Sequence, residues 1–425
     1  MRHDPPSACQ PFPQRHGDDR VRAGQVADRF LRSVTQSAPS MDPDHAWRFF
    51  GEGLLLGDSP ADALVAWMHK TGMGQARPMV ERAIEDGLKA VPHAPEPLRR
   101  FIEHVEARPN WVDDAMLAEG ARVCCLGGLA GMRALLVTGL LAGYQFSAIN
   151  QTLIATGSLE KGARRRVAET TKWWVDVTRP GAMARHGAGF KNTLRVRLIH
   201  AMVRRHVAAR DDWDAAELGV PVNQTDMQLT LLGFSLIYLL SIRLVGVFPT
   251  KDEGRALMHL WRYIAWVNGV DERYLFDLNA PIQSAIALFG ANVRHQRMSD
   301  DKSKRLASAL VDEALERRYP HMSWWMGRYN RALQLSIARL VLDKAARLEL
   351  GLEVPLVPWY PLLVAPCNVV LHRAARALPG GRRLLVRRGA RQQNAYLETL
   401  FGREDQSVRG LHEVLGRKAR SALSF

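Results

Sequence analysis

Helical periodicity constrains the fold of this chain more than any other feature of its sequence. From about residue 43 onwards, apolar residues recur at intervals of three and four, as they do along one side of an α-helix. Long runs that alternate between apolar and polar residues, the pattern of β-strands, are absent. The sequence therefore predicts an all-α protein. We expect a single large helical domain, because no internal boundary is visible along the 425 residues.

The helices are predicted to end at clusters of Pro and Gly, which interrupt the periodicity. Thr225, followed by Gln228 three residues later, has the spacing of a capping box and predicts the start of a helix. The predicted helices span residues 60–72, 77–90, 95–107, 112–126, 128–157, 159–178, 190–209, 225–246, 251–268, 279–297, 301–316, 324–349 and 360–376.

The two ends of the chain differ in composition from this helical region. Residues 1–42 begin with a polar, Pro-rich stretch and lack the apolar run that a secretory signal requires, so we expect a disordered tail of a cytoplasmic protein. Residues 43–376 form the predicted helical domain. Residues 377–425 contain a cluster of arginines and are predicted to form a basic C-terminal extension.

Two segments are long and apolar enough to raise the question of membrane spans. Residues 134–158 carry no charge, and residues 227–250 carry only Arg243. Both segments nevertheless contain amide and hydroxyl side chains that are costly to bury in lipid. The mean hydropathy of −0.17 is also that of a soluble protein. We therefore expect both segments to form core helices.

Charge and motifs restrict the class of function. A net charge of +15 raises the prospect of an anionic partner such as nucleic acid, a lipid surface or an anionic cofactor. No signature of a sequence-specific nucleic-acid-binding module accompanies the basic residues, so we expect no specific nucleic acid. Four cysteines without CxxC spacing argue against a disulfide scaffold. HExxH, GxGxxG, Walker and GxSxG motifs are absent, which disfavours zinc proteases, dinucleotide and nucleotide enzymes, and esterases.

His200 is the first candidate for chemistry. Arg197 and Arg204 stand three residues before and four residues after it, so all three share one side of a predicted helix. One imidazole with two flanking cations suits haem, whose iron takes a histidine and whose propionates need cationic partners. On this helix alone, the pattern favours a hydrogen-bonded histidine at the edge of a basic face, because a lone histidine is weak evidence for a metal.

The preceding predicted helix offers a second set of candidates. Arg166, Thr170, Trp173 and Trp174 fall at spacings of three and four, which places a guanidinium, a hydroxyl and two indoles along one side. Such a side could line a cofactor pocket, or the arginine could be a surface charge and the tryptophans plain core. Two further histidines have no partner at metal-ligand spacing: His186 and His206.

Taken together and in order, these segments resemble a known family. Residues 155–177, the Gly-rich loop after them, RLIHAMVR at 197–204, residues 219–235 and residues 358–389 are similar to the bacterial rubber oxygenases, or latex-clearing proteins. They also resemble the fungal endoplasmic-reticulum oxygenase that shortens the farnesyl chain in mycophenolic acid biosynthesis. The resemblance spans residues 110–395. Its most specific element is Arg166-x-x-x-Thr170 followed, 34 residues after the arginine, by His200.

This resemblance implies a haem b protein with a globin-like helical core. By matching position, it implies that His200 is the proximal iron ligand and that Arg197 and Arg204 neighbour the haem. It further implies that Arg166 and Thr170 belong to the catalytic pocket. Rubber-cleaving members have a glutamate sixteen residues before the arginine, where this chain has Asn150.

The resulting expectation is a haem-dependent oxygenase that uses O2 on a carbon–carbon double bond of an apolar, isoprenoid- or lipid-like substrate. The alternative is a non-catalytic haem-binding sensor or carrier, in weak contact with an anionic membrane surface through the arginine-rich end. A third reading, a helical interaction protein, involves no cofactor.

Overall fold

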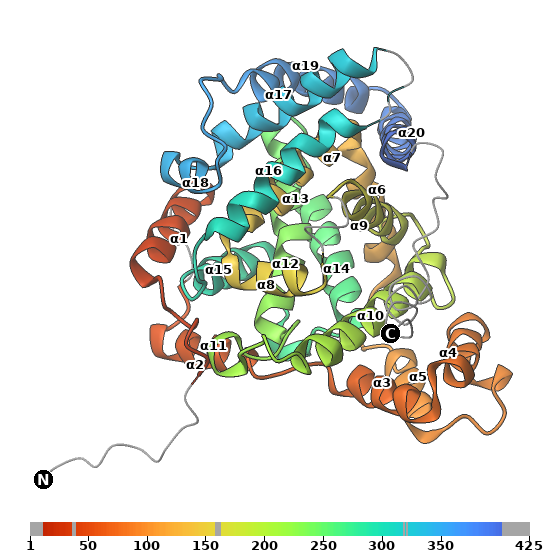
Figure 1. The fold of residues 1–425 in the computed structure, drawn as a ribbon. Helices are drawn as coiled ribbons and strands as arrows, with labels where there is room; N and C mark the ends of the chain where they lie inside the picture. Colours follow the sequence, from red (N-terminus) through yellow and green to blue (C-terminus); the bar gives the residue numbers. More distant parts are fainter. Residues whose placement is uncertain (1–11, 36–39, 158–162, 318, 320–321, 402–425) are drawn as a thin grey trace, which may run out of the picture.

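A computed structural model describes residues 12–35, 40–157, 163–317, 319 and 322–401. Within these residues every regular element is helical (Figure 1), which confirms the all-α prediction. The helices of the first half are α1 (Arg20–Val34), α2 (Pro43–Gly53), α3 (Ser59–Thr71), α4 (Met73–Asp86), η1 (Leu88–Ala90), α5 (Glu96–Glu106), α6 (Asp114–Leu126), α7 (Gly128–Leu135), η2 (Leu136–Leu141), η3 (Ala142–Gln145), α8 (Ser147–Ala155), α9 (Ala163–Val177) and α10 (Ala188–Ala208). Those of the second half are α11 (Ala215–Leu218), α12 (Gln224–Phe234), α13 (Leu236–Leu244), α14 (Lys251–Val267), η4 (Glu272–Tyr274), α15 (Pro281–Val293), α16 (Asp301–Glu316), α17 (Ser323–Val341), α18 (Lys344–Glu349), α19 (Trp359–Ala377) and α20 (Gly381–Phe401).

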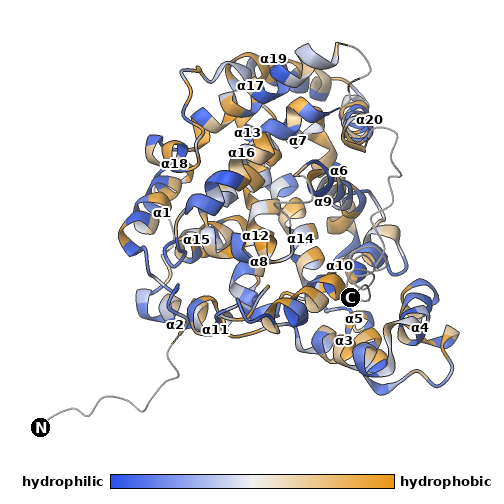
Figure 2. Ribbon diagram, viewed as in Figure 1, coloured by the Kyte–Doolittle hydropathy of each residue, from blue (hydrophilic) through white to orange (hydrophobic). Residues whose placement is uncertain are grey.

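Helix α14 occupies the middle of the molecule, and α6, α10, α12, α13 and α15 pack around it. Its start is fixed by a capping box in which Thr250 and Glu253 exchange side-chain and backbone hydrogen bonds. The approach of α6 is close because Gly120 has no side chain. A Cβ atom there would lie 2.3 Å from the Ala256 carbonyl oxygen. Figure 2 shows the apolar residues concentrated on these inner helices.

The two long apolar segments are interrupted helices. The segment predicted as one helix over 128–157 comprises α7, a π-helical turn (η2), a 3-10 turn (η3) and α8. The segment predicted over 225–246 breaks at Ser235 between α12 and α13. By length and composition, Gln224–Leu244 could cross a membrane, and α6 with the bent segment Gly128–Gln145 forms a second, broken candidate. Of the apolar window in Gln224–Leu244, 61% is buried inside the fold, as expected of a core helix.

The predicted cap of α12 was wrong. The N-cap is Asn223, whose side chain accepts a hydrogen bond from the Asp226 backbone N–H. The Thr225 hydroxyl instead donates to the Phe50 carbonyl, and Gln228 donates to the Tyr274 carbonyl. Both side chains are buried and bind distant backbone, so tertiary contacts outweigh the local capping pattern.

Both ends of the chain contribute more structure than we expected. Residues 20–34, assigned to a disordered tail, form α1, which packs on α15 through Ala23 and Ala27. Residues 381–401, assigned to a basic extension, form α20, which packs on α6, α7, α9 and α19. The remaining parts of these predictions, residues 1–11 and 402–425, lie outside the described residues.

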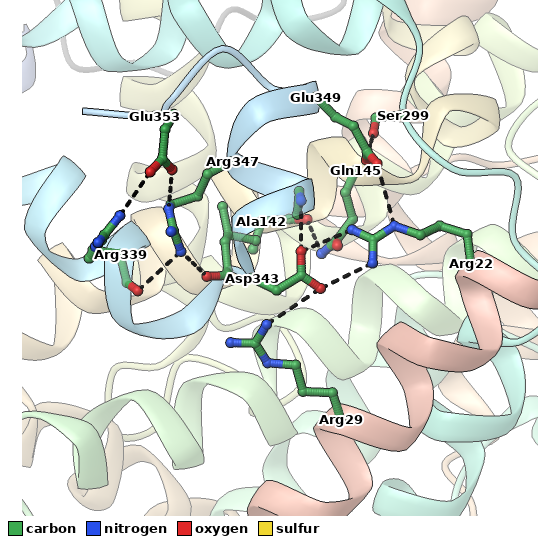
Figure 3. Close-up of polar contacts among 12 residues, drawn as sticks. Arg22, Arg29, Ala142, Gln145, Ser299, Arg339, Asp343, Arg347, Glu349 and Glu353 are labelled. Carbon is green, nitrogen blue, oxygen red and sulfur yellow. Dashed lines mark hydrogen bonds and ion pairs between the residues drawn. The ribbon is translucent and has the colours of Figure 1, made fainter. Parts of the chain in front are cut away.

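An ion-pair network fixes α1 against α18 (Figure 3). Arg22 donates both terminal nitrogens to the Asp343 carboxylate, at 3.0 and 3.1 Å, and its Nε lies 3.4 Å from Glu349. Arg29 reaches the same Asp343 at 3.4 Å. Asp343 also caps α18 by accepting from the Ala346 N–H. One carboxylate therefore joins two helices that are more than 300 residues apart in sequence.

Substitutions of Asp343 separate its two roles. Asp343→Asn keeps a capping acceptor but removes the charge, and we expect it to lower the free energy of unfolding by about 0.5–1 kcal/mol because the ion pairs are only partly shielded from water. Asp343→Ala also removes the cap and should cost about 1 kcal/mol more. Urea unfolding followed by circular dichroism measures both. Asp301→Asn, an exposed first-turn aspartate of α16, is the control; equal stability of all three variants would contradict the network.

Candidate functional site

His200 lies in the second half of α10, with Val196, Ile199 and Val203 on the same side of the helix. All four side chains are partly accessible to solvent, whereas Leu198, Ala201 and Met202 on the opposite side are buried in the core. The stretch of α10 around His200 therefore presents one imidazole within an accessible apolar side.

The imidazole of His200 is neutral and has no hydrogen-bond partner among the described residues. Burial, reinforced by the positive charge of Arg204 and opposed by Asp58, lowers the pKa of His200 to about 4. Its Nδ1 atom is buried and makes no hydrogen bond. A neutral imidazole is the form that binds metals, because a protonated ring has no free lone pair. His200 is therefore in the correct state to be a ligand.

Arg197 is held in a buried ion pair. Its guanidinium donates to both oxygens of Asp58, at 2.7 and 2.9 Å, and to the Val267 carbonyl at 3.2 Å. Gly269 makes room for this pair, since a Cβ atom there would lie 2.2 Å from the Asp58 carboxylate. The charge of Arg197 is thus already balanced within the protein. Its predicted position beside a haem propionate stays a prediction.

Arg204 is paired in the same way one helical turn beyond His200. It donates to Asp62 at 2.6 Å and to the Val222 carbonyl at 3.1 Å. Burial raises the pKa of Asp62, although Arg204 opposes this shift. Asp58 and Asp62 are the N-cap and an early residue of α3. Helix α3 therefore supplies a carboxylate to each arginine that flanks His200, which the spacing of the arginines alone did not predict.

Arg166 on α9 is a partly buried cation with an unused donor. Its Nη2 donates to the Tyr144 hydroxyl, and the guanidinium carbon lies 5.5 Å from the centre of that ring. Its Nη1 is buried and makes no hydrogen bond. Burial lowers the pKa of Arg166 to about 10, so the side chain keeps its charge at neutral pH. Such an unsatisfied donor costs free energy in the folded protein, and it is available to a ligand.

Thr170 lies one turn after Arg166 on α9 and is partly accessible. Helix α9 packs against α10, so the two helices that carry the predicted site residues are neighbours. The predicted catalytic roles of Arg166 and Thr170 stay predictions. The other two histidines do not join this group as ligands of one ion: within the described residues, no three His, Cys, Asp or Glu side chains converge on a point.

Asn150 is fixed by hydrogen bonds. It is buried on α8, and its Nδ2 donates to the Tyr144 carbonyl at 2.9 Å and to the Ser303 hydroxyl at 3.0 Å. Tyr144 therefore binds both Asn150, through its backbone, and Arg166, through its hydroxyl. The resemblance predicts a carboxylate at this position, but this chain has an amide there. The Asn150 amide positions Tyr144, whose hydroxyl accepts a hydrogen bond from Arg166.

Helices α12 and α13 present a further accessible side in the middle of the fold. Thr230 is exposed, and Gly233, Phe234, Ile237 and Leu240 are partly accessible at helical spacing. Gly233 faces open space, since no atom lies within 4 Å of the position of a Cβ there. The other sides of these helices are buried. This accessible side is mainly apolar. That residues 227–246 supply an apolar wall of a substrate pocket stays a prediction.

The two tryptophans predicted to line the pocket belong mainly to the core. Trp173 is 8% exposed and Trp174 is 1% exposed. Trp173 packs edge-on against Phe234 with ring centres 5.7 Å apart, and Trp174 packs on Tyr238 at 4.6 Å. Trp173 therefore supports the accessible side of α12 through Phe234, and Trp174 lies deeper.

A separate cavity of about 690 Å³ lies away from this site, between α16, α17 and residues 354–356. Arg331 at its edge is paired with Asp312, and Arg328 stacks on Trp324. Its lining contains none of the residues predicted from the sequence, so it does not belong to the candidate site.

The fold and the site together define an all-α domain in which one neutral histidine lies beside accessible apolar helix sides. The family model described as "ER-bound oxygenase mpaB/B'/Rubber oxygenase, catalytic domain" matches residues 121–379, more than half of the chain. The chain therefore belongs to this family of oxygenase catalytic domains, which are oxidoreductases. The matched residues include His200, Arg166 and both accessible helix sides.

Two known proteins are similar to this chain. A rubber oxygenase from Streptomyces sp. (strain K30) is 25% identical over 248 residues, which cover 57% of this chain and 58% of that protein. The match thus spans less than two thirds of the relative's length. A solved structure of latex clearing protein LCP in the closed state has a TM-score of 0.54 at 19% identity and covers 81% of this chain and 91% of that one. This likeness confirms the single-domain helical fold.

Replacing Tyr144 by Phe tests the Arg166 contact. The variant leaves the buried guanidinium with a second unsatisfied nitrogen, and we expect the free energy of unfolding to fall by about 1–3 kcal/mol. Chemical unfolding of the protein measures the change. Tyr329→Phe, which removes a hydroxyl from a side chain that is 41% exposed, should have almost no effect. If the two variants were equally stable, the hydroxyl of Tyr144 would not hold Arg166.

Proposed function

We propose that this protein is a haem-dependent oxygenase that acts with O2 on a carbon–carbon double bond of an apolar substrate. The observation that carries this proposal is the state of His200: a neutral, partly accessible imidazole with no hydrogen-bond partner in the described part of the chain, within the region that matches an oxygenase family. The substrate class is taken by analogy from the similar Streptomyces protein, which is a rubber oxygenase.

The residues of the site fit a haem group. A haem takes a single imidazole from the protein and supplies four nitrogen ligands itself, so one histidine is sufficient. The unpaired Nδ1 of His200 and the open space beside Gly233 are consistent with a group that the protein chain does not provide. When bound, haem supplies the redox chemistry that activates dioxygen.

The chain's own residues prepare this site. The two arginine–aspartate pairs fix α10 on α3 and so orient His200. Their carboxylates largely balance the arginine charges, so a further anion next to His200 gains less from these arginines than the sequence suggested. Arg166 is different because its Nη1 is free to bind an anionic or polar group. The sides of α12 and α10 that carry Phe234, Ile237, Ile199 and Val203 would exclude water from an apolar substrate.

Haem binding tests the first half of the proposal. The full-length protein reconstituted with haemin should show a Soret band and bind one haem per chain. His200→Ala should lose the band or shift it, because the imidazole ligand is gone. His206→Ala, six residues further along α10 and exposed, should leave the spectrum unchanged. A colourless wild-type protein, or identical spectra for all three, would rule out His200 as the ligand.

Turnover tests the second half. Incubation of the haem-loaded protein with a panel of isoprenoids and unsaturated lipids under isotopically labelled dioxygen should give a product that contains the label. Mass spectrometry identifies the product and distinguishes double-bond cleavage from insertion. The His200→Ala variant should form none, and neither should an anaerobic sample. Unlabelled product, or equal product from the variant, would contradict the proposed reaction.

A non-catalytic haem-binding sensor or carrier is the second candidate function. It is favoured by Asn150, an amide locked in two hydrogen bonds where a carboxylate could have acted as a base. This candidate predicts the same haem spectrum and reversible gas binding but no labelled product from any member of the panel.

A further inference from the structure

Helix α19 presents an apolar side to solvent. Its first fourteen residues, 359–372, contain no charged residue. Leu362, Leu363 and Val370 are 63%, 65% and 68% exposed, and Pro366 and Cys367 between them are exposed as well. Surface helices normally present polar side chains to water and apolar ones to the core. We call these five residues the α19 face.

The orientation of α19 is fixed by its other side, so the α19 face is not a core surface. Asn368 donates to the Val245 carbonyl at 2.8 Å. Gly246 lies against Ala365 so closely that a Cβ atom would be 2.1 Å from the Ala365 carbonyl oxygen. Tyr360 and His372 are buried on this inner side. The helix thus packs on the end of α13 and leaves its most apolar stripe uncovered.

Neighbouring helices extend the same kind of surface. Of the sixteen large apolar side chains that are exposed among the described residues, all but Val21, Leu55 and Phe248 fall within residues 315–384. They include Trp324 and Trp325 on α17, at 58% and 62% exposure. Helix α17 packs on α19, and the two lie together at one end of the molecule (Figures 1 and 2). A clustered apolar surface of this kind marks an interaction site.

Helix α20, which packs beside α19, adds a row of unpaired arginines. Arg383, Arg387, Arg388 and Arg391 recur at one-turn spacing and are all exposed. None of the four has an ion pair or hydrogen bond in the described part of the chain, unlike Arg376 and Arg382, which share Glu253. This row of arginines extends to α19. Burial is the main cause that lowers the pKa of His372 on α19, and the positive charges of Arg376 and Arg388 lower it further.

We propose that the α19 face inserts into the surface of an anionic lipid bilayer, with the α20 arginines contacting the headgroup phosphates and Trp324 and Trp325 at the interface. An uncharged apolar stripe flanked by cations and indoles is the composition of helices that lie in the plane of a membrane. This proposal does not depend on haem or on any reaction.

Charge favours lipid over a second copy of the chain as the occupant. In the described residues of α19 and α20, Glu398 is the only acidic residue. Two copies meeting through this surface would bring eight arginines together with almost no carboxylate to balance them, which is unfavourable. An anionic bilayer supplies the opposite charge over the whole area.

Vesicle binding by the full-length protein tests the proposal. We expect co-sedimentation with vesicles of phosphatidylcholine and phosphatidylglycerol, and much weaker binding to phosphatidylcholine alone. Leu363→Gln with Val370→Gln should weaken binding about a hundredfold, roughly tenfold for each inserted apolar side chain. Arg387→Gln with Arg388→Gln should weaken it about 25-fold, roughly fivefold for each arginine near the anionic surface. High salt should reduce only the arginine contribution.

Two matched measurements exclude trivial explanations. Val21→Gln with Arg32→Gln makes the same kinds of change on exposed residues of α1 and should bind as the wild type does. Cys367, which lies within the α19 face, can carry an environment-sensitive fluorophore in a Cys9→Ser background, since Cys124 and Cys125 are buried. Its emission should shift to shorter wavelength on anionic vesicles.

Three outcomes would overturn the proposal. The first is a wild-type protein that does not bind phosphatidylglycerol vesicles. The second is a Leu363/Val370 variant that remains folded by circular dichroism and binds as the wild type does. The third is a wild-type dimer by light scattering that this variant converts to a monomer, since that result would assign the α19 face to a second copy of the chain.

Discussion

The site depends on two arginine–aspartate pairs that hold α10 on α3. Arg197 with Asp58 and Arg204 with Asp62 lie on either side of His200, and the first pair is almost completely buried. Breaking a buried pair by removing one partner typically costs about 3–5 kcal/mol, because a charge remains in the interior without compensation. These pairs fix the backbone of α10 on either side of His200, although neither pair forms a hydrogen bond with the imidazole. The arginines thus act as structural supports of the site in the free protein.

Buried polar atoms that make no hydrogen bond carry a different kind of information from these paired groups. Most buried polar groups in a folded protein are hydrogen-bonded, so the exceptions are informative. Nδ1 of His200 and Nη1 of Arg166 are both buried without a partner, on two helices that pack together. Tyr144 on the 3-10 turn η3 binds Arg166, and Asn150 on α8 holds Tyr144; η3 directly follows the π-helical turn η2. A π-helical turn often occurs at a functional site, because it changes the direction of the side chains that follow. Two of the unsatisfied buried groups of the described residues therefore lie on the helices where the family's chemistry is expected.

The proposed membrane surface and the proposed reaction are compatible but separate. An apolar substrate dissolves in lipid far better than in water, so an oxygenase of such a substrate gains by binding to a bilayer. The α19 face and the accessible sides of α10 and α12 lie on different elements, and α13 connects them: α19 packs on the end of α13, and α13 continues α12. Each proposal can fail without the other.

The sequence by itself determined the helical class and most helix positions, and it supplied the candidate site residues. Periodicity gave helices such as α14 and α16 to within a residue or two, because their apolar stripes and caps are local features. Spacing together with the family resemblance singled out His200, Arg166 and Thr170 as candidates. Spacing alone also allowed an ordinary hydrogen-bonded histidine and a surface arginine.

Only the tertiary structure decided which groups are paired. Arg197 pairs with Asp58, which lies 139 residues away in the sequence. The N-cap of α12 is Asn223 and not Thr225, because long-range burial and hydrogen bonding outweigh the local capping pattern. The tertiary structure also decided that residues 20–34 and 381–401 fold: their charged sequences look like tails, and they become helices because α15, α18, α6 and α9 offer surfaces that bury one side of each.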